Sequence, residues 1–501
     1  MRTLLCNARF YYRNRIDNNV KAMLIESGKI THIFLEGETL PLDATIWDMQ
    51  GQYVYPGFID THTHSFEGGL YSAGVDLYDC KNIAEVLEQI QAALLQLQNK
   101  EDKMLFCWRL DENALAESRF PTVEELDSLG SDVCILIRRI DGHSCVINSF
   151  ARKHIAQLSG NQDSVLRGVD NDHAVHWFHG NCGQEKIYEA YQTAAQIALK
   201  GGFTTIHTMI GDAEHSITHY SFIDSRLPRF PIEYILYPQS FNLEAALDAG
   251  ATRIGGCILA DGSIGSHTAG LTQAYEDSKD NFGTLYKTDD FWYEFIRTAH
   301  QHNLQVGVHC LGDRAIRQIN NAYLKLAKTD YKDIRHQLIH CEITPNDLVL
   351  QIKTSGAIPV MQPAFDHYWG GTHGFYASRL GAERSLIMNR LKTFVNNNIK
   401  VTGGSDWYIT ELDAIKGMCA AMNHHNKSER LSPKEAIQIY TSNAAYLSHD
   451  ETRLGLLEEG FQADFTILDS QLSILSTSDN THIKAVIKRG ELAFGNFETN
   501  V

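Results

Sequence analysis

The chain has 501 residues, and its 61 acidic residues outnumber 44 basic ones, giving a formal net charge of −17. A hydrophobic content of 43% excludes a disordered or fibrous protein and allows a large core. The acidic balance excludes a general nucleic-acid binder, because phosphate contacts need a basic surface. No apolar stretch approaches the roughly 20 residues of a membrane span, and residues 1–12 lack the features of a secretory signal, so we expect a cytoplasmic protein.

Both ends of the chain contain short strand-like segments separated by polar or Gly-containing turns. The expected strands are Leu4–Ala8, Ala22–Ile25, Ile30–Leu35, Thr45–Asp48, Ala463–Leu468 and Ile483–Arg489. Neither group is long enough to form a stable domain alone. We therefore expect a small β-sandwich domain built from residues 1–55 and 450–501.

The middle of the chain, residues 56–449, alternates strands with helices, a pattern typical of a parallel sheet. The expected strands are Tyr55–Asp60, Phe203–Met209, Ile232–Tyr237, Arg253–Ala260, Leu304–His309, Arg335–His340, Ala357–Met361 and Ile399–Gly404. The expected helices are Gln184–Lys200, Phe291–His302, Asp313–Ala327 and Asn346–Lys353. Eight strands are the number that closes a (β/α)8 TIM-like barrel, and this is the predicted α/β fold.

The gap between the first two strands is far too long for one crossover, so we expect an inserted subdomain at about residues 67–182. The insert is predicted to contain a helix at Ile83–Gln98 and strands at Met104–Leu110 and Val133–Arg138. A group of His173, His176 and His179 falls within it, and we expect a solvated loop there because Gly180 would interrupt a helix.

Four histidines and one aspartate fall at the carboxyl ends of the predicted strands, where barrel enzymes place their chemistry. They are His62, His64, His309, His340 and Asp406. In an extended chain, the first two project to the same side because they are two residues apart. Imidazole and carboxylate suit Zn²⁺ and similar divalent ions, so the pattern predicts a metal centre of one or two ions, most simply zinc.

At this point the chain resembles the amidohydrolase superfamily, and within it the YtcJ-like branch, labelled amidohydrolase family 3, which includes N-substituted formamide deformylase. The segments that carry the resemblance are Pro56–His64, Arg139–His143, Gly202–Thr205, Asp261–Ala269, His309–Asp313, Arg335–His340 and Gly404–Asp406. A barrel with a β-sandwich from both termini is what this resemblance implies. It also implies hydrolysis of a small-molecule carbon–nitrogen bond of the amide, N-acyl or N-formyl type.

Two positions depart from the branch. Cys257 stands where the branch commonly has a Lys that, when carboxylated, bridges two metals in related hydrolases. A thiolate can also ligate zinc, so Cys257 is a candidate ligand, and a small buried side chain is the alternative. His267 stands where the branch usually has Arg, which would alter the preference for an anionic or polar substrate group.

The resemblance implies that Asp406 accepts the proton of the attacking water and returns it to the departing amine. Asp60 and His207 are candidates for orienting the ligands. The candidate substrate contacts are His143, Asp261, Ser263, His267 and Trp369. The last of these lies in an aromatic, Gly-rich stretch, residues 366–375, that is suited to a mobile lid.

Two other functions remain open on the sequence. One is an amidohydrolase-type deaminase of a cyclic amidine or nucleobase-like compound, although no Glu lies near His309 to act as the expected acid. The other is a catalytically silent barrel used for binding. The expected partner is a small-molecule substrate rather than nucleic acid or a membrane, and a homodimer is compatible with the sequence.

Overall fold

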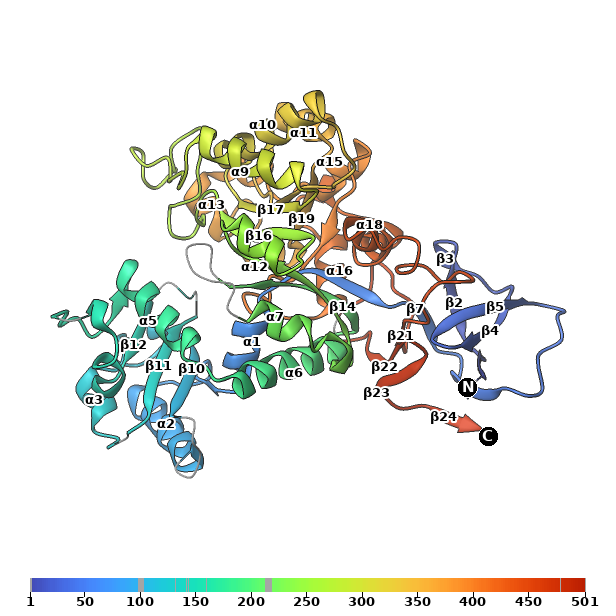
Figure 1. The fold of residues 1–501 in the computed structure, drawn as a ribbon, viewed down its shortest axis with the longest axis horizontal. Helices are drawn as coiled ribbons and strands as arrows, with labels where there is room; N and C mark the ends of the chain where they lie inside the picture. The colour runs from blue at the N-terminus through green and yellow to red at the C-terminus, as the bar shows by residue number, and fades with distance from the viewer. Residues whose placement is uncertain are drawn as a thin grey trace. The chain divides into compact units, whose positions relative to one another are not determined.

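The computed structural model describes residues 2–500 except 98–102, 131, 141, 143, 159, 212–218 and 478. The chain divides into two compact units, one formed by residues 1–64 and 195–501 and the other by residues 65–194 (Figure 1). Among the described residues, no helix has both the length and the apolar character needed to cross a bilayer.

Eight parallel strands form the centre of the first unit, and each coincides with a strand predicted from the sequence. They are β8 (Phe58–Thr63), β14 (Phe203–Ile210), β15 (Glu233–Pro238), β16 (Arg253–Leu259), β17 (Gln305–Cys310), β18 (Gln337–His340), β19 (Ile358–Met361) and β20 (Thr402–Gly403). Hydrogen bonding groups them into two sheets, in the orders β15-β14-β8 and β16-β17-β18-β19-β20. A parallel bridge between Thr63 and Trp407 also links the end of β8 to the segment after β20.

The helices between these strands follow the predicted pattern, with bounds close to those expected from the sequence. The four predicted ones are α6 (Gln184–Lys200), α9 (Asp289–Gln301), α10 (Asp313–Thr329) and α11 (Asn346–Ser355). On α10, Ile316, Ile319, Tyr323 and Leu326 are buried, so one face of the helix packs inward. Further helices of this unit are α7 (Tyr220–Asp224), α8 (Leu243–Asp248), α12 (Pro363–Trp369), α13 (Phe375–Leu380), α14 (Ala382–Ser385), α15 (Leu391–Asn396), α16 (Ala414–Met422), α17 (Pro433–Ile439) and α18 (Ser442–Leu447).

A bulge interrupts the pairing of β16 with β17. Gly255 pairs with Gly307, but the next pair is Ile258 with Val308, so β16 carries two extra residues at this point. Gly255 and Gly256 have φ values of +82° and +84°, a region that side-chain-bearing residues rarely adopt. A Cβ on Gly256 would lie 2.1 Å from Met209 Sδ, so that buried side chain would have to move to admit it. The two glycines thus set the backbone that presents the following residue, Cys257.

The terminal strands form two sheets, with orders β24-β6-β1-β4-β5 and β23-β22-β21-β7-β2-β3. Their bounds are β1 (Arg2–Cys6), β2 (Arg9–Tyr12), β3 (Arg15–Ile16), β4 (Val20–Glu26), β5 (Lys29–Leu35), β6 (Thr45–Asp48), β7 (Tyr53–Pro56), β21 (Phe465–Leu468), β22 (Ile483–Lys488), β23 (Glu491–Gly495) and β24 (Glu498–Asn500). In Figure 1 the blue strand β7 lies beside the red strand β21, and the two pair antiparallel. Side chains from both sheets, including Phe10, Trp47 and Phe465, share one hydrophobic core.

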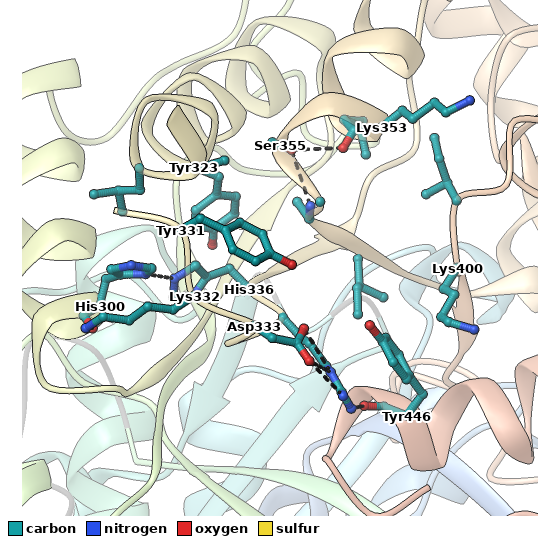
Figure 2. Close-up of a pocket in the computed structure, with 18 of the residues that line it drawn as sticks. His300, Tyr323, Tyr331, Lys332, Asp333, His336, Lys353, Ser355, Lys400 and Tyr446 are labelled. Atoms are coloured by element: carbon teal, nitrogen blue, oxygen red, sulfur yellow. Dashed lines mark hydrogen bonds and ion pairs between the residues drawn. The ribbon is translucent and has the colours of Figure 1, made fainter. Parts of the chain in front are cut away.

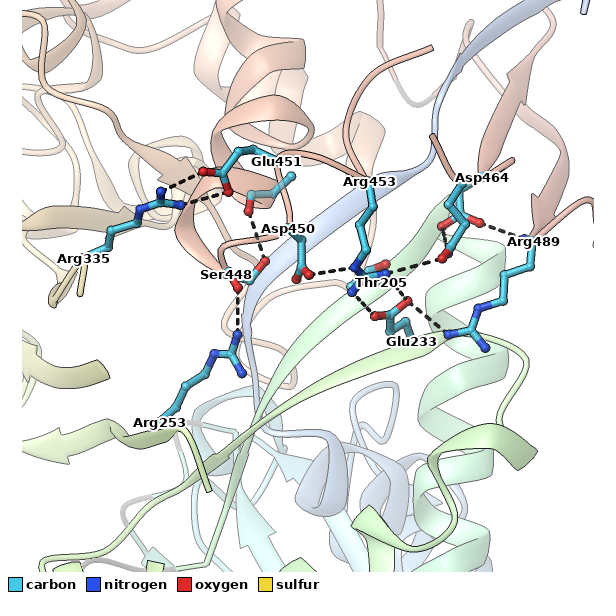
Figure 3. A network of polar contacts seen from close by, with 12 residues as sticks. Thr205, Glu233, Arg253, Arg335, Ser448, Asp450, Glu451, Arg453, Asp464 and Arg489 are labelled. Carbon is cyan, nitrogen blue, oxygen red and sulfur yellow. Dashed lines mark hydrogen bonds and ion pairs between the residues drawn. The ribbon is translucent and has the colours of Figure 1, made fainter. Parts of the chain in front are cut away.

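An ion-pair network connects β15 and β22 with the segment between α18 and β21 (Figure 3). Lys488 Nζ lies 3.2 Å from Glu233 Oε2 and 2.8 Å from Asp464 Oδ2, and Arg453 also pairs with Glu233. Lys488 and Asp464 are buried. Buried charges are expensive unless each has a partner, so this network depends on all of its members.

The second unit is a five-stranded sheet in the order β13-β12-β11-β10-β9 with helices packed against it. Its elements are α1 (Ser65–Ser72), β9 (Val75–Asp76), α2 (Ile83–Leu97), β10 (Met104–Leu110), α3 (Val123–Asp127), β11 (Cys134–Arg139), β12 (Ser144–Ile147), α4 (Ser149–Arg152), β13 (Leu166–Arg167) and α5 (Val169–Gly180). The predicted insert, residues 67–182, lies within this unit.

The expectation of a solvated loop around His173, His176 and His179 is wrong, because all three lie on α5. Gly180 is the last residue of that helix rather than an interruption. His179 Nε2 lies 3.0 Å from the Tyr71 hydroxyl, which also accepts a hydrogen bond from Arg138. This histidine is therefore part of a polar contact inside the second unit.

Candidate metal centre

Five predicted ligands lie close together at or just beyond the carboxyl ends of β8, β16, β18 and β20. They form two overlapping groups, His62 with Cys257 and His340, and His62 with His64 and Asp406. Within each group the ligand atoms all lie within 4.8 Å of one another. The Nε2 atoms of His62 and His64 are 3.1 and 3.2 Å from Asp406 Oδ1. Their role as ligands stays a prediction, but the structure brings them together.

The backbone around His62 is held by Asp60, one of the two predicted orienting residues. Asp60 Oδ1 accepts the backbone N–H of His62 at 2.9 Å, and Oδ2 accepts that of Ser405 at 3.0 Å. The N–H of Asp406 donates in turn to the carbonyl of His62 at 2.9 Å. Asp60 therefore joins the end of β8 to the segment that carries Asp406.

The other predicted orienting residue, His207, is placed differently. Its side chain is fully buried, and its Nδ1 lies 3.2 Å from the Tyr237 hydroxyl. Burial, with the nearby Arg253 and His62, holds the pKa of His207 well below its usual range. A neutral imidazole packed on Tyr237 is part of the polar core rather than a partner of a predicted ligand.

The side chains of the two groups perturb one another's pKa values. Burial alone would lower the pKa of His62, but Asp406 and Cys257 raise it to about 9. Burial opposes ionisation of Cys257, whereas His340, His62 and His64 bring the pKa of its thiol well below the usual range. The pKa of Asp406 is likewise lowered, against burial, by His62 and His64. The arrangement therefore favours anionic sulfur and oxygen donors facing positive charge.

This donor set fits a divalent metal ion. Both ring nitrogens of His62, Nδ1 of His309 and Oδ1 of Asp406 are buried, and within the described chain they have no hydrogen bond of normal geometry. Ligand atoms about 2.0–2.1 Å from a tetrahedral zinc ion lie about 3.3 Å apart, which matches the two Asp406 contacts. Thiolate, imidazole and carboxylate are all donors that divalent transition-metal ions accept.

His340 is oriented by the amide of Gln362. Its Nδ1 lies 2.7 Å from Gln362 Oε1, and because that oxygen can only accept, Nδ1 carries the proton. Nε2 is then the lone-pair nitrogen available to a metal. Gln362 could not be predicted, because it follows β19 as an ordinary polar residue.

His309 lies beside His340, with ring centroids 4.6 Å apart, but it does not belong to either group of ligand atoms. Its Nδ1 is 3.6 Å from Asp261 Oδ1. Asp261 is fully buried, and its two oxygens accept the backbone N–H groups of Gly270, Leu311 and Gly312 at 2.8–3.0 Å. Asp261 therefore joins the loop after β16 to the segment after β17 through hydrogen bonds. This role differs from the substrate contact expected from the sequence.

The remaining candidate substrate contacts have partners within the chain or lie outside the described residues. Ser263 Oγ bonds Ser266 Oγ at 2.7 Å, and His267 Nε2 lies 2.9 Å from Asp277 Oδ1. Trp369 packs against the core around Tyr376. His143 lies outside the described residues. In the stretch expected to form a lid, residues 366–369 belong to α12 and Phe375 begins α13, whereas residues 370–374 between them are not helical.

Sequence reasoning missed Glu342, a fully buried carboxyl group two residues beyond His340. Burial raises its pKa to about 8, and the carboxylates of Asp261, Asp406 and Asp366 act in the same direction, whereas the Tyr376 hydroxyl opposes them. An acidic residue after a strand normally indicates a solvated loop, so the sequence held no signal for its burial.

A cavity of about 240 Å³ lies elsewhere, between α10, α11 and the amino ends of β18 and β19 (Figure 2). It contains none of the predicted site residues. His300 and His336 form a hydrogen-bonded pair at its edge, with Nδ1 of the former 2.9 Å from Nε2 of the latter. His336 Nδ1 accepts the N–H of Val306 at 3.1 Å, so its Nε2 carries the proton of this pair. Both imidazoles are buried.

Comparison with known proteins agrees with this geometry. Residues 45–494 match the model described as "Amidohydrolase family". The Bacillus subtilis (strain 168) protein named "Putative amidohydrolase YtcJ" is 25% identical over 479 residues, which cover 84% of each chain. N-substituted formamide deformylase of Arthrobacter pascens is 21% identical over 514 residues, covering 90% of each. The crystal structure of an uncharacterised metal-dependent hydrolase from Pyrococcus horikoshii OT3 covers 96% of this chain and all of its own, with a TM-score of 0.81 and 22% identity.

Proposed function

The chain belongs to the amidohydrolase family, which confirms the resemblance drawn from its motifs, and on that premise we propose the bond that it hydrolyses. The proposed substrate is a small molecule with an amide, N-acyl or N-formyl carbon–nitrogen bond. The observation that carries the proposal is the pair of contacts from Asp406 to His62 and His64, which unites a carboxylate with the two imidazoles.

His62, His64 and Asp406 would hold one divalent ion, and Cys257 and His340 with His309 would complete the site for a second. When bound, a zinc ion lowers the pKa of water and polarises the scissile carbonyl. Cys257 supports this arrangement because its thiol is buried and the imidazoles of His340, His62 and His64 lower its pKa. Metal stoichiometry measures whether one or two ions bind per chain.

Asp406 is the proposed proton carrier. Its Oδ1 faces His62 and His64, so we assign proton transfer to Oδ2. Oδ2 accepts a proton from the attacking water and delivers it to the leaving nitrogen, which departs as a neutral amine. The same carboxylate can remain a ligand through Oδ1 while Oδ2 moves the proton.

We further propose that the eight strands close into a (β/α)8 barrel. All eight are parallel within their sheets and follow one another in chain order, and the candidate ligands lie near the carboxyl ends of β8, β16, β17, β18 and β20. The bridge between Thr63 and Trp407 supports closure between the first and last strands. A barrel would place every candidate ligand at one mouth.

Metal-loaded protein tested against N-formyl, N-acyl and cyclic amides provides the experiment. We expect amine release by the wild type, and loss of turnover with retained fold in Asp406→Asn and in His309→Ala. Asp347→Asn, at an exposed ion pair with Arg317, is the matched control and should retain full activity. Metal analysis should give one or two ions per chain.

Three outcomes would contradict parts of the proposal. Full activity in Asp406→Asn would remove the assignment of the proton carrier. Ammonia released from cyclic amidines, without cleavage of any amide, would favour a deaminase instead. A protein that stays folded after chelation and hydrolyses nothing when Zn²⁺ or Mn²⁺ is restored would indicate a catalytically silent barrel.

A further inference from the structure

The cavity of about 240 Å³ between α10 and α11 lies at the opposite end of the central strands from the candidate metal centre. On β18 the two ends are marked by His336, which precedes the strand and lines the cavity, and by His340, which ends it. At about 3.3 Å per residue, the chain between them spans about 13 Å. Because one water needs only about 10–15 Å³, the cavity has room for a small organic molecule.

The cavity is open to solvent along its rim. Exposed residues from three segments line it, namely Tyr331, Lys353, Gly356, Asn398 and Lys400. Figure 2 shows Lys353 and Lys400 on one side of the cavity and His300 with Lys332 on the other. A ligand can therefore enter from solvent between these segments.

Positive side chains gather around this cavity. Lys332, Arg335, Lys353 and Lys400 line it, against a single acid of the described lining, Asp333. The chain as a whole carries a formal net charge of −17, so a local excess of cations is an exception on this protein. Clefts lined by one sign of charge raise the local concentration of small ions of the opposite sign. The cavity is therefore a place where a small anion is favoured.

Two of the four cations are already engaged within the chain. Arg335 Nη2 lies 2.7 Å from Glu451 Oε1, and Lys332 Nζ donates hydrogen bonds to two oxygens at 3.0 and 3.1 Å. Lys353 and Lys400, in contrast, form no ion pair with any residue that the structure describes. Their ammonium groups are the ones available to an anionic ligand.

The rest of the lining is largely apolar. The ring of Tyr446 lies beside both kinds of surface, with Arg335 Cζ 3.6 Å and Lys400 Nζ 4.6 Å from its centroid. The aliphatic side chains that line the cavity are Leu326, Ala327, Ile352, Ala357, Ile358 and Ile399. An inorganic ion would leave this apolar surface in contact with water, whereas a ligand with an apolar body would cover it. The lining thus suits an anion that carries a hydrocarbon group.

We propose that this cavity binds a small organic carboxylate with an apolar body. Lys353 and Lys400 supply the charge-assisted hydrogen bonds to the carboxylate, and the aliphatic side chains with the Tyr446 ring contact the body. The site is separate from the candidate metal centre and does not depend on the proposed hydrolase function.

The first test compares benzoate with benzyl alcohol, a neutral probe of similar size, by calorimetry on zinc-loaded and chelated protein. Wild type should bind benzoate about 10- to 100-fold more tightly, the range expected of a hydrogen bond to a charged group. The preference should persist after chelation, which excludes ligation of the carboxylate by metal. The double variant Lys353→Met, Lys400→Met should abolish it, and Lys353→Arg, Lys400→Arg should retain it.

Two single variants separate charge from space. Lys434→Met removes an exposed lysine from α17, outside the cavity, and should retain the full preference. Ala327→Phe changes no charge but fills part of the cavity, so it should weaken the binding of benzoate and benzyl alcohol alike. Unfolding midpoints of all variants show whether each retains its fold.

The second test replaces benzoate with inorganic phosphate, an anion without an apolar body. Phosphate should bind more weakly than benzoate, and Ala327→Phe should affect it less. Phosphate binding as tight as that of benzoate would overturn the assigned ligand class.

Four other results would overturn the inference as a whole. They are equal binding of benzoate and benzyl alcohol by wild type, an unchanged preference in the double methionine variant, loss of benzoate binding on chelation, and an equal loss of preference in Lys434→Met. The third would assign the carboxylate to the metal centre, and the fourth would indicate a general attraction to surface lysines.

Discussion

Replacement of Gly256 by alanine should test whether the β16 bulge positions Cys257. The glycine has a φ of +84°, so an added Cβ costs about 1–2 kcal/mol in backbone conformation. That Cβ would also lie 2.1 Å from Met209 Sδ and 3.0 Å from Tyr237 Cβ. Overpacking of this kind costs about 1–3 kcal/mol, so we expect a total destabilisation of about 2–5 kcal/mol.

Gly250 provides a matched control for the backbone part of this cost. Its φ is +73°, close to that of Gly256, but nothing lies within 4 Å of the position a Cβ would take. Gly250→Ala should therefore cost only about 1–2 kcal/mol. The difference between the two variants isolates the steric contribution at the bulge.

The expected consequence at the site is loss of metal rather than loss of fold alone. A shift of the bulge moves the Cys257 thiol away from the two histidines with which it forms a ligand group. We expect zinc affinity to fall about 10- to 100-fold in Gly256→Ala, as for other disturbances of ligand support, and to be unchanged in Gly250→Ala. Urea unfolding measures stability, and competition with a chelator measures affinity. Equal stability and equal zinc affinity in the two variants would refute the reasoning.

Three further variants test other parts of the molecule. Burial holds the pKa of His336 at about 3, below its usual 6.5, so the stability that its neutral form contributes above pH 6.5 is lost as the pH falls towards 3. Between pH 7 and pH 5 the wild type should lose about 2 kcal/mol of unfolding free energy that His336→Asn does not lose, as measured by urea unfolding at each pH. Lys488→Met removes the cation beside the buried Asp464, which keeps hydrogen bonds from Gln462 Nε2 and the Arg489 N–H, and should destabilise the protein by about 3–5 kcal/mol. An unchanged unfolding midpoint would show that the network is dispensable. Asp60→Asn weakens the hydrogen bond that holds the backbone of His62, and we expect zinc affinity to fall about 10- to 100-fold when it is measured by competition with a chelator. An unaltered affinity would show that Asp60 does not support His62 as a ligand.

The central strands could be predicted because most are short runs of apolar and β-branched residues between turn signals. Residues 203–210 combine Phe, Ile and Met with three Thr, and the strand is wholly buried. His62, His64 and Asp406 were predictable for a related reason, since their positions follow from the strand ends. Helix α5 was not, because its sequence is polar and rich in His and Asp, which gives little helical periodicity.

The features that the sequence concealed depend on contacts between distant segments. An Asp-Gly pair after β16 has the composition of an ordinary turn, and only the fold reveals that Asp261 reaches the loop after β17. Two consecutive glycines in β16 indicate a bulge only once the register with β17 is known. The full burial of Glu342 likewise becomes visible only when the segments around it are placed.

The hydrogen bonds to Asp261 restrict which residues can replace the donors and the acceptor that join the two loops. The three donors are peptide N–H groups, at Gly270, Leu311 and Gly312, so proline is excluded at each of these positions. A Cβ on Gly312 would also lie 2.1 Å from the carbonyl oxygen of Gly270, so glycine is required where the two loops meet. The acceptor of all three bonds is the carboxyl group of Asp261. A side chain at Gly312 would therefore force the two loops apart, and a substitution at Asp261 would remove all three bonds together.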